Sequence, residues 1–178
     1  MEFWFSEFHT PDVKHSIRVS RQLYSKQSDY QRIDIFETPE FGRVLTLDGN
    51  VMLTERDEFI YDEMIVHVPM AVHKQAKDIL VIGAGDGGVV RELTRYDRVE
   101  RIDLVEMDPQ VVEACRAFLP SNACRMDDRR VHIYFENALK YSAAARRSTT
   151  SSSWTPPIPS AHPRVCSPAS STAAASMP

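Results

Sequence analysis

Residues 78–93 read DILVIGAGDGGVVREL, and this stretch decides the fold. The short apolar run 78–83 predicts a parallel strand that is buried on both faces. The pattern over 87–96 predicts a helix. The turn between them, GAGDGG (83–88), is rich in glycine, and Gly83, Gly85 and Gly87 let the chain turn sharply out of the strand. Because glycine permits sharp turns and leaves the backbone bare, the stretch indicates a site where a ligand meets a helix N-terminus.

Strand and helix signals continue to alternate after this unit. Residues 101–108, RIDLVEMD, predict a second strand, and residues 131–137, VHIYFEN, predict a third. Between them, 109–119 predicts a helix that begins with Pro109, since proline is favoured in the first helical turn. Strand, helix, strand, helix, strand is the pattern of a doubly wound α/β fold with right-handed crossovers.

The residues before this unit predict a β-rich part followed by a helix. Three runs bounded by turn residues predict strands, at 30–37, 41–48 and 50–54. Asp48-Gly49 is a hairpin-type turn pair. Residues 57–73 predict a helix, which Pro69 should kink or shorten. Its apolar residues recur at helical spacing, namely Phe59, Ile60, Met64 and Val68.

We expect three parts in the 178 residues. Residues 1–56 should form a small N-terminal β-strand domain, and residues 57–141 the first half of a nucleoside-binding α/β core. Residues 142–178 are rich in Ser, Pro, Ala and Thr, a composition typical of a disordered tail.

Composition excludes several classes of protein. The net charge is −4 and no basic run is present, which argues against a nucleic-acid partner. The start, MEFWFSEFHT, does not resemble a signal peptide, and no stretch is long enough to span a membrane. The cysteines Cys115, Cys124 and Cys166 lack metal-ligand spacing, so we expect no metal and interpret them as free thiols in a reducing cytoplasm.

Glu106 ends the second strand, 21 positions after Gly85. An acidic residue about 20 residues beyond such a loop is typical of a ribose binder, because a carboxylate accepts hydrogen bonds from both vicinal hydroxyls. The alternative is a solvated acid at a strand end.

Asp86 lies inside the glycine loop, where its charge selects among ligands. A carboxylate here repels pyrophosphate and the carboxylate of S-adenosylmethionine, whereas it attracts an ammonium group. We therefore expect an adenosine compound with a cationic tail. This argues against a nicotinamide-dependent dehydrogenase and, less firmly, against an ordinary methyltransferase. Helix N-capping is a competing role for Asp86, and both roles can hold.

The order of motifs resembles the polyamine aminopropyltransferase family, which includes the spermidine synthases. The matching stretches are YQRIDIFETPEFGRVLTLDGNVMLTERDEFIYDEM (30–64), VIGAGDGGVVREL (81–93), DLVEMDPQVV (103–112) and YFENAL (134–139). The resemblance implies a small β-domain on a Rossmann-like, methyltransferase-type parallel sheet. It implies aminopropyl transfer from decarboxylated S-adenosylmethionine, a co-substrate rather than a permanently bound cofactor, to putrescine, giving spermidine and methylthioadenosine. Family members form homodimers or homotetramers.

The resemblance also implies roles for the cofactor-binding residues. Gln31 matches a glutamine that contacts the nucleoside, Asp86 the aspartate that holds the aminopropyl amine, and Glu106 the ribose binder. Asn137 and Ala138 stand where the family usually has an aspartate and a small residue that read the adenine edge. Asn137 is a departure, and because its amide oxygen accepts without a charge we expect weaker binding rather than none.

Two further residues match the acceptor pocket. Tyr61 corresponds to a tyrosine that lines the putrescine site, although an ordinary aromatic residue of an amphipathic helix is an alternative. Asp62 occupies a position where the family often has His or Gln, and an acid there can still attract a diamine.

The last third of the chain departs from the family. Family members continue into a fourth strand followed by an aspartate, the proposed general base for the amine, and nothing in 142–178 matches that motif. No catalytic residue is therefore assigned. Codons can be chosen for residues 150–162 that, read in a frame shifted one base earlier, encode Leu-Ile-Ile-Val and Asp-Ser-Thr-Asp-Pro-Ile-Gly-Pro. We hypothesise a frameshift between Lys140 and Ser148.

A sheet without its remaining strands leaves an uncovered edge, so we expect the chain to be aggregation-prone and poorly active. Two alternatives stay open. One is an S-adenosylmethionine-dependent N-methyltransferase acting on a diamine, and the other is an inactive nucleoside-binding fragment.

Overall fold

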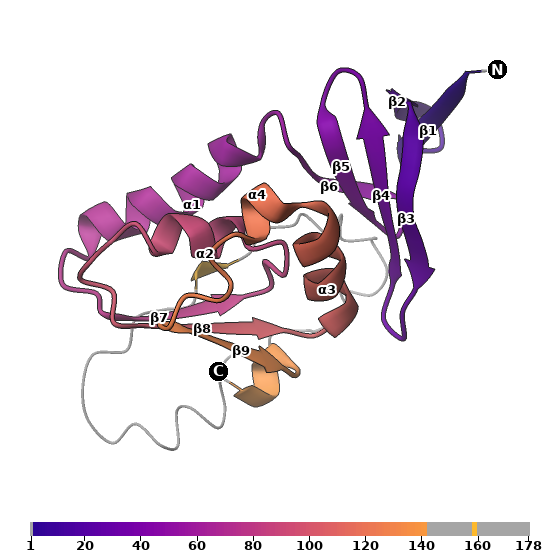
Figure 1. Ribbon diagram of the computed structural model, residues 1–178. Coiled ribbons are helices and arrows are strands. Elements are labelled where there is room, and N and C mark those ends of the chain that lie inside the picture. The colour runs from indigo at the N-terminus through magenta and orange to yellow at the C-terminus, as the bar shows by residue number, and fades with distance from the viewer. Residues whose placement is uncertain (1, 142–157, 160–178) are drawn as a thin grey trace, which may run out of the picture.

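The computed structural model describes residues 2–141 and the two residues 158–159 (Figure 1). Its N-terminal part is antiparallel. A hairpin pairs β1 (Phe3–Thr10) with β2 (Val13–Val19). A four-stranded sheet follows in sequence order, formed by β3 (Arg21–Gln27), β4 (Arg32–Thr38), β5 (Gly42–Leu47) and β6 (Asn50–Thr54). The predicted Asp48-Gly49 turn joins β5 to β6, and both residues have positive φ, +50° and +78°.

The second part is an α/β unit built on a parallel sheet. It contains α1 (Glu58–Val72), β7 (Asp78–Ile82), α2 (Gly88–Leu93), β8 (Arg101–Glu106), α3 (Pro109–Phe118), α4 (Pro120–Ala123), β9 (Val131–Phe135) and β10 (Ile158–Pro159). The strand order is β10-β7-β8-β9, and neighbouring strands pair in parallel. The predicted fold class, an antiparallel β part followed by a partial Rossmann-like sheet, is confirmed. Helix α1 continues three residues past Pro69.

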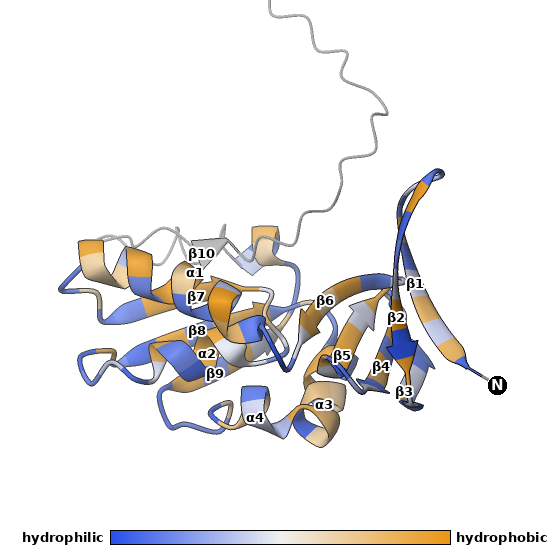
Figure 2. Cartoon of the chain, turned by 90° about the horizontal axis from the view of Figure 1, so that it is seen from above, coloured by the Kyte–Doolittle hydropathy of each residue, from blue (hydrophilic) through white to orange (hydrophobic). Residues whose placement is uncertain are grey.

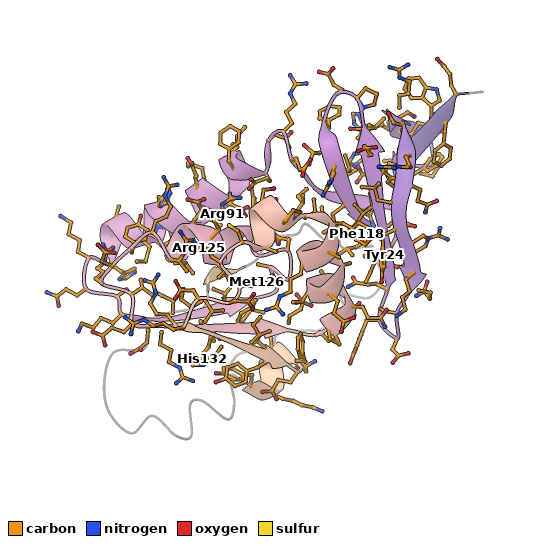
Figure 3. All side chains as sticks on the ribbon, in the orientation of Figure 1. Tyr24, Arg91, Phe118, Arg125, Met126 and His132 are labelled. Atoms are coloured by element: carbon orange, nitrogen blue, oxygen red, sulfur yellow. The ribbon has the colours of Figure 1, made fainter. Side chains whose placement is uncertain are left out.

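Among the described residues, two apolar clusters form the core. One lies between the helices and the parallel sheet and contains Val66, Val90 and Leu104. The other joins the N-terminal sheet to α3 through Ile33, Leu45, Cys115 and other residues of these elements. The rings of Tyr24 and Phe118 meet at this contact, with centroids 5.5 Å apart, and Figure 3 labels both. The N-terminal sheet is thereby held against the helix that follows β8.

Strand β7 of the parallel sheet is buried on one face only. Helices α1, α2 and α4 lie on the same side of it in Figure 1. Ile79 and Val81 are buried, whereas the alternating residues Leu80 and Ile82 are half-buried. The predicted burial of this strand on both faces is therefore wrong for the part of the chain that the structure describes. Residues two apart in a strand share a face, so the half-buried pair marks the less covered side.

Candidate functional site

The glycine loop leaves β7 and enters α2 through a left-handed backbone. Gly83, Ala84 and Gly87 have φ values of +71°, +78° and +94°. The N–H of Gly83 donates to the carbonyl of Val105 at 2.9 Å, which ties the loop to the end of β8. Glycine adopts positive φ at little cost, so Gly83 and Gly87 fit this backbone well. Ala84 carries a side chain, so its backbone conformation is strained.

Glu106 lies directly against this loop. A Cβ added to Gly85 would lie 3.0 Å from Glu106 Oε2. The backbone of Gly85 can therefore lie this close to the carboxylate only because glycine has no side chain. Burial raises the pKa of Glu106, while N–H groups of Asp108, Met107 and Gly85 donate to the carboxylate and oppose that rise. The structure therefore brings together the two residues whose spacing the sequence singled out.

Asp86 and Asp62 form an acidic pair at the start of α2. Asp86 Oδ2 accepts the Gly88 N–H two residues later at 3.1 Å, whereas the N-cap residue of α2 is Gly87. Asp62 is buried on α1, and a Cβ on Gly88 would lie 1.8 Å from its Oδ2. Burial, a hydrogen bond to Glu58 and the nearby charges of Asp86 and Glu58 raise the pKa of Asp62 to about 9. A pKa raised this far predicts that Asp62 is protonated at pH 7.

Glu58 is held in place by Arg91, labelled in Figure 3. The Arg91 Nη1 and Nη2 atoms lie 2.9 Å from the two carboxylate oxygens of Glu58. This two-point ion pair joins α1 to α2 next to Asp62. The acidic pair thus lies beside an ion pair that links the two helices.

Gln31 reaches the same region from the N-terminal part. Its Nε2 donates to Asp108 Oδ2 at 3.2 Å, and Asp108 N–H donates to Glu106 Oε1 at 3.0 Å. Ser28 Oγ donates to the same Asp108 oxygen at 2.6 Å. Gln31, Asp108, Glu106 and Gly85 therefore form a continuous chain of contacts across the two parts of the protein.

The remaining predicted site residues are less closely joined. Asn137 and Ala138 follow β9, which pairs in parallel with β8 up to Phe135 and Glu106. They therefore lie at the carboxyl ends of the strands, as the glycine loop does. Asn137 is exposed, and its Oδ1 accepts the Leu139 N–H at 2.9 Å. Tyr61 lies on α1 with 40% of the residue exposed.

Sequence analysis missed Asp108, which is 1% exposed. It precedes Pro109, and its Oδ1 accepts the Gln110 N–H at 3.0 Å as an N-cap. An aspartate followed by proline at a helix start is the signal that was available. Its second oxygen binds partners some 80 residues earlier, which no local pattern contains.

We expect Asp108→Ala to lower the free energy of unfolding by about 2–3 kcal/mol. The change removes an N-cap and leaves Ser28 and Gln31 without their buried acceptor. Urea titration measures the loss. Asp127→Ala is the control, because this side chain is 87% exposed and its ion pair to Arg116 should contribute under about 1 kcal/mol. Equal effects of the two substitutions would contradict the assignment.

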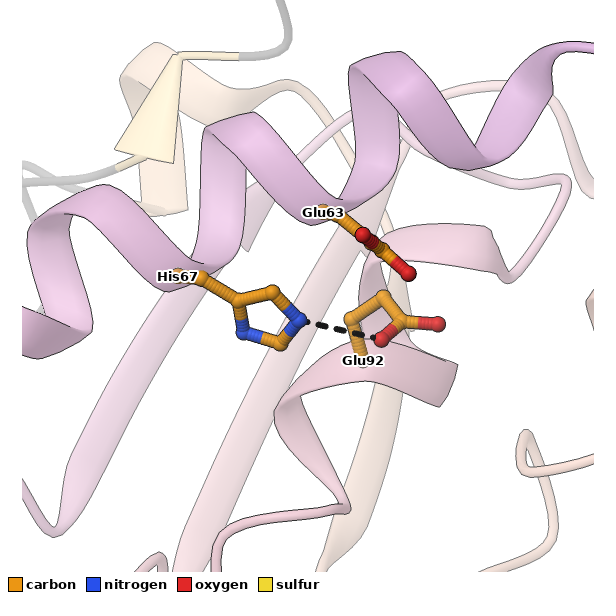
Figure 4. A group of neighbouring side chains, drawn as sticks. All are labelled: Glu63, His67 and Glu92. Atoms are coloured by element: carbon orange, nitrogen blue, oxygen red, sulfur yellow. Dashed lines mark ion pairs between the residues drawn. The ribbon is translucent and has the colours of Figure 1, made fainter.

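A second polar group joins α1 to α2 away from the glycine loop. Glu63, His67 and Glu92 offer ligand atoms within 4.8 Å of one another, and His67 Nε2 lies 3.3 Å from Glu92 Oε2 (Figure 4). Sequence spacing did not indicate this group. Arg91 and Arg95 already pair with Glu92, at 2.9 and 2.5 Å. Since these guanidinium groups supply the positive charge, we interpret the group as an ion-pair network.

Other features lie outside this site. Cys115 and Cys124 are free thiols. A hollow is lined by Asp97, Glu100, Asp128 and Arg130, which come just before β8 and β9 in the sequence. It therefore lies at the amino ends of these strands, away from the glycine loop at the carboxyl ends. Among the described helices, none has the length and apolar character needed to cross a membrane.

Several predictions fall outside the described residues. These are Cys166, the position of the frameshift, and all of the expected tail except Ile158 and Pro159, which form β10.

Comparison with known proteins follows the same division of the chain. Residues 58–151 match a family model described as the spermine/spermidine synthase domain. Residues 3–55 match one described as the spermidine synthase tetramerisation domain.

Similar proteins include polyamine aminopropyltransferases from Clostridium botulinum and Alkaliphilus oremlandii, 60% and 58% identical over 141 residues. That alignment covers 79% of this chain but 50% of each relative, so the chain spans about half their length. Spermidine synthase from Thermotoga maritima superposes with a TM-score of 0.77 at 46% identity, over 78% of this chain and 49% of that one. A spermidine synthase bound to the transition-state analogue AdoDATO superposes with a TM-score of 0.76 at 46% identity. The superposition covers 78% of this chain and 48% of that one. The chain therefore belongs to the spermine/spermidine synthase family of polyamine aminopropyltransferases.

Proposed function

We propose that this chain carries the cofactor half of an aminopropyltransferase, which transfers an aminopropyl group from decarboxylated S-adenosylmethionine to putrescine. The observation that carries the proposal is the presence of two carboxylates at the glycine loop, one inside the loop and one packed against it. Glu106 lies against Gly85 with N–H donors on its oxygens, and Asp86 lies in the loop two residues before α2 begins. A ribose and a cationic tail are the groups that suit these two acids.

The other site residues take roles consistent with this ligand. Gln31, fixed by its bond to Asp108, is proposed to contact the nucleoside, and Asn137 with Ala138 the adenine edge. Tyr61 and Asp62 are proposed to line the diamine site. The raised pKa of Asp62 predicts a protonated acid in the free protein, and the ammonium charge of a bound diamine would favour its ionisation.

The acceptor amine must lose a proton before it attacks, and the family position for that base lies outside the described residues. Turnover by this chain is therefore a separate question from cofactor binding, and an inactive nucleoside-binding fragment remains the second candidate. We propose domain limits of 1–56 and 57–141, assembly into homo-oligomers through residues that match the tetramerisation model, and a cytoplasmic setting.

Asp86→Asn tests the proposal. We expect the unchanged chain to bind decarboxylated S-adenosylmethionine more tightly than S-adenosylmethionine. The variant should lose about tenfold in affinity for the first compound, because one charge-assisted contact to the amine is weakened, and should discriminate less between the two. Isothermal titration calorimetry with both compounds gives the ratio.

Asp127→Asn, which removes an exposed carboxylate elsewhere, is the matched control for net charge. A preference for the carboxylated compound in the unchanged chain would instead favour an N-methyltransferase. Unaltered selectivity in Asp86→Asn would remove the charge argument.

A further inference from the structure

The carboxylate of Asp108 binds donors from both parts of the protein. Asp108 precedes α3, the helix that lies beside the N-terminal sheet in both views (Figures 1 and 2). Its Oδ1 accepts the Gln110 N–H at 3.0 Å, and its Oδ2 accepts Ser28 Oγ at 2.6 Å and Gln31 Nε2 at 3.2 Å. Because Asp108 is buried, breaking one of these bonds leaves a polar atom without a partner, so the three donors are held in place.

Ser28 fixes the turn that leads into Gln31. The Ser28 hydroxyl accepts the backbone N–H groups of Tyr30 and Gln31, each at 3.0 Å. Its single proton has two acceptors within reach, and the Asp108 oxygen at 2.6 Å is closer than the Gln31 carbonyl at 3.0 Å. The backbone of Gln31 is therefore tied to Asp108 through Ser28, and its side chain is tied to Asp108 directly.

The same carboxylate decides which way the Gln31 amide faces. A carboxylate only accepts hydrogen bonds, whereas an amide has a donor end and an acceptor end. Turned the other way, the amide would place its oxygen against a carboxylate oxygen, and two acceptors repel each other. The Gln31 amide therefore presents its nitrogen to Asp108, which leaves the oxygen Oε1 as the end of the amide that can accept a bond from a ligand.

Asp108 also holds the proposed ribose-binding acid. Its backbone N–H donates to Glu106 Oε1 at 3.0 Å, next to the Met107 N–H at 2.8 Å. With Oε1 held in this way, Oε2 is the oxygen that lies against Gly85. Gln31 belongs to the N-terminal part and Glu106 to the α/β part, so the placement of these two acceptors relative to each other depends on Asp108.

We propose that Asp108 is a positioning residue for the nucleoside, because it orients the Gln31 amide so that its oxygen meets the ligand, at a fixed place relative to the Glu106 carboxylate. Asp108 itself does not touch the ligand, since its own oxygens are bonded within the protein. The inference rests on the proposed function. It adds which end of the Gln31 amide the nucleoside meets and which residue decides this.

Exchanging the chemistry of the two side chains tests this. Asp108→Asn keeps an oxygen for the Gln110 N–H but turns an amide N–H toward Gln31, so the Gln31 amide must reverse and offer its nitrogen to the ligand. Gln31→Glu instead places a second carboxylate against Asp108. In Asp108→Asn/Gln31→Glu the new amide donates to the new carboxylate, and an acceptor oxygen again faces the ligand. Isothermal titration calorimetry with methylthioadenosine, the nucleoside product of the proposed reaction, measures each affinity.

We expect each single substitution to weaken methylthioadenosine binding by about tenfold, and the double variant to bind within about threefold of the unchanged chain. A merely structural role of Asp108 predicts that the two losses add instead. Gln22→Glu is the matched control, because Gln22 Nε2 donates to Asp34 Oδ1 at 3.0 Å in the same sheet, and it should bind as the unchanged chain does. If Gln31→Glu does not fold, the double variant must still bind more tightly than Asp108→Asn.

Two results would overturn the inference, and they differ in what else they overturn. If the unchanged chain binds methylthioadenosine but the double variant binds no better than Asp108→Asn, the positioning role of Asp108 is wrong and the proposed function stands. If the unchanged chain does not bind methylthioadenosine, the proposed function is wrong and this inference falls with it.

Discussion

Replacing Gly88 by alanine is expected to lower the free energy of unfolding by about 3 kcal/mol. Gly88 is the first residue of α2 and is buried. The added Cβ would lie 1.8 Å from Asp62 Oδ2 and 2.6 Å from its Cγ. Asp62 is itself 4% exposed and hydrogen-bonded to Glu58, so it has little room to move. The clash must therefore separate α1 from α2.

The direction of this effect is diagnostic, because glycine to alanine in an unstrained helix normally stabilises by about 0.5–1 kcal/mol. Urea titration of Gly88→Ala measures the sign. The same substitution made in an Asp62→Ala background should cost much less, since the clashing carboxyl is gone. Stabilisation by Gly88→Ala in the unchanged chain would show that the contact is not as close as described.

The alternation of strands and helices was predictable from sequence over 78–137. Buried parallel strands read as apolar runs, and the glycine turn and Pro109 mark where helices begin, so the observed elements differ from the predicted ones by a few residues. The hairpin at Asp48-Gly49 was predictable for the same reason, because few residue pairs accept two successive positive φ values.

Helix α1 shows what periodicity leaves undecided. Phe59, Ile60, Met64 and Val68 predict a helix correctly, yet all four are exposed in the part of the chain that the structure describes. The face that packs inward contains Asp62, Val66 and Met70, including a buried acid. A helical pattern reports spacing, and which face is covered depends on elements distant in sequence.

The site was predictable where a single turn or strand end holds the residue, as for Asp86 and Glu106. It was not predictable where the contact spans the chain. Ser28 and Gln31 meet Asp108 across about 80 residues, and the burial of Asp62 depends on Gly88, 26 positions later. Neither contact has a local signature, because both depend on how α1 and the N-terminal sheet pack against the later helices.

Asp62→Asn is expected to stabilise the protein, increasingly so as pH rises. Burial, the hydrogen bond to Glu58 and the charge of Asp86 raise the pKa of Asp62 from 3.8 to about 9. A carboxyl with a raised folded-state pKa contributes its full stability below the unfolded-state pKa and loses it as pH rises toward the folded-state pKa. Between about pH 4 and 9, each unit of pH should therefore cost the unchanged chain up to about 1.4 kcal/mol through this group.

Asparagine matches the protonated acid in shape and can donate to Glu58 as that acid does, but it never ionises. We expect the free energy of unfolding of Asp62→Asn to exceed that of the unchanged chain by roughly 3 kcal/mol at pH 8 and by clearly less at pH 5. Urea titrations at intervals from pH 5 to pH 9 give the two curves, with Asp127→Asn as the control for net charge. Parallel curves would show that Asp62 ionises without cost, and the buried acid beside the glycine loop would then be charged and ready to meet an ammonium group in the free protein.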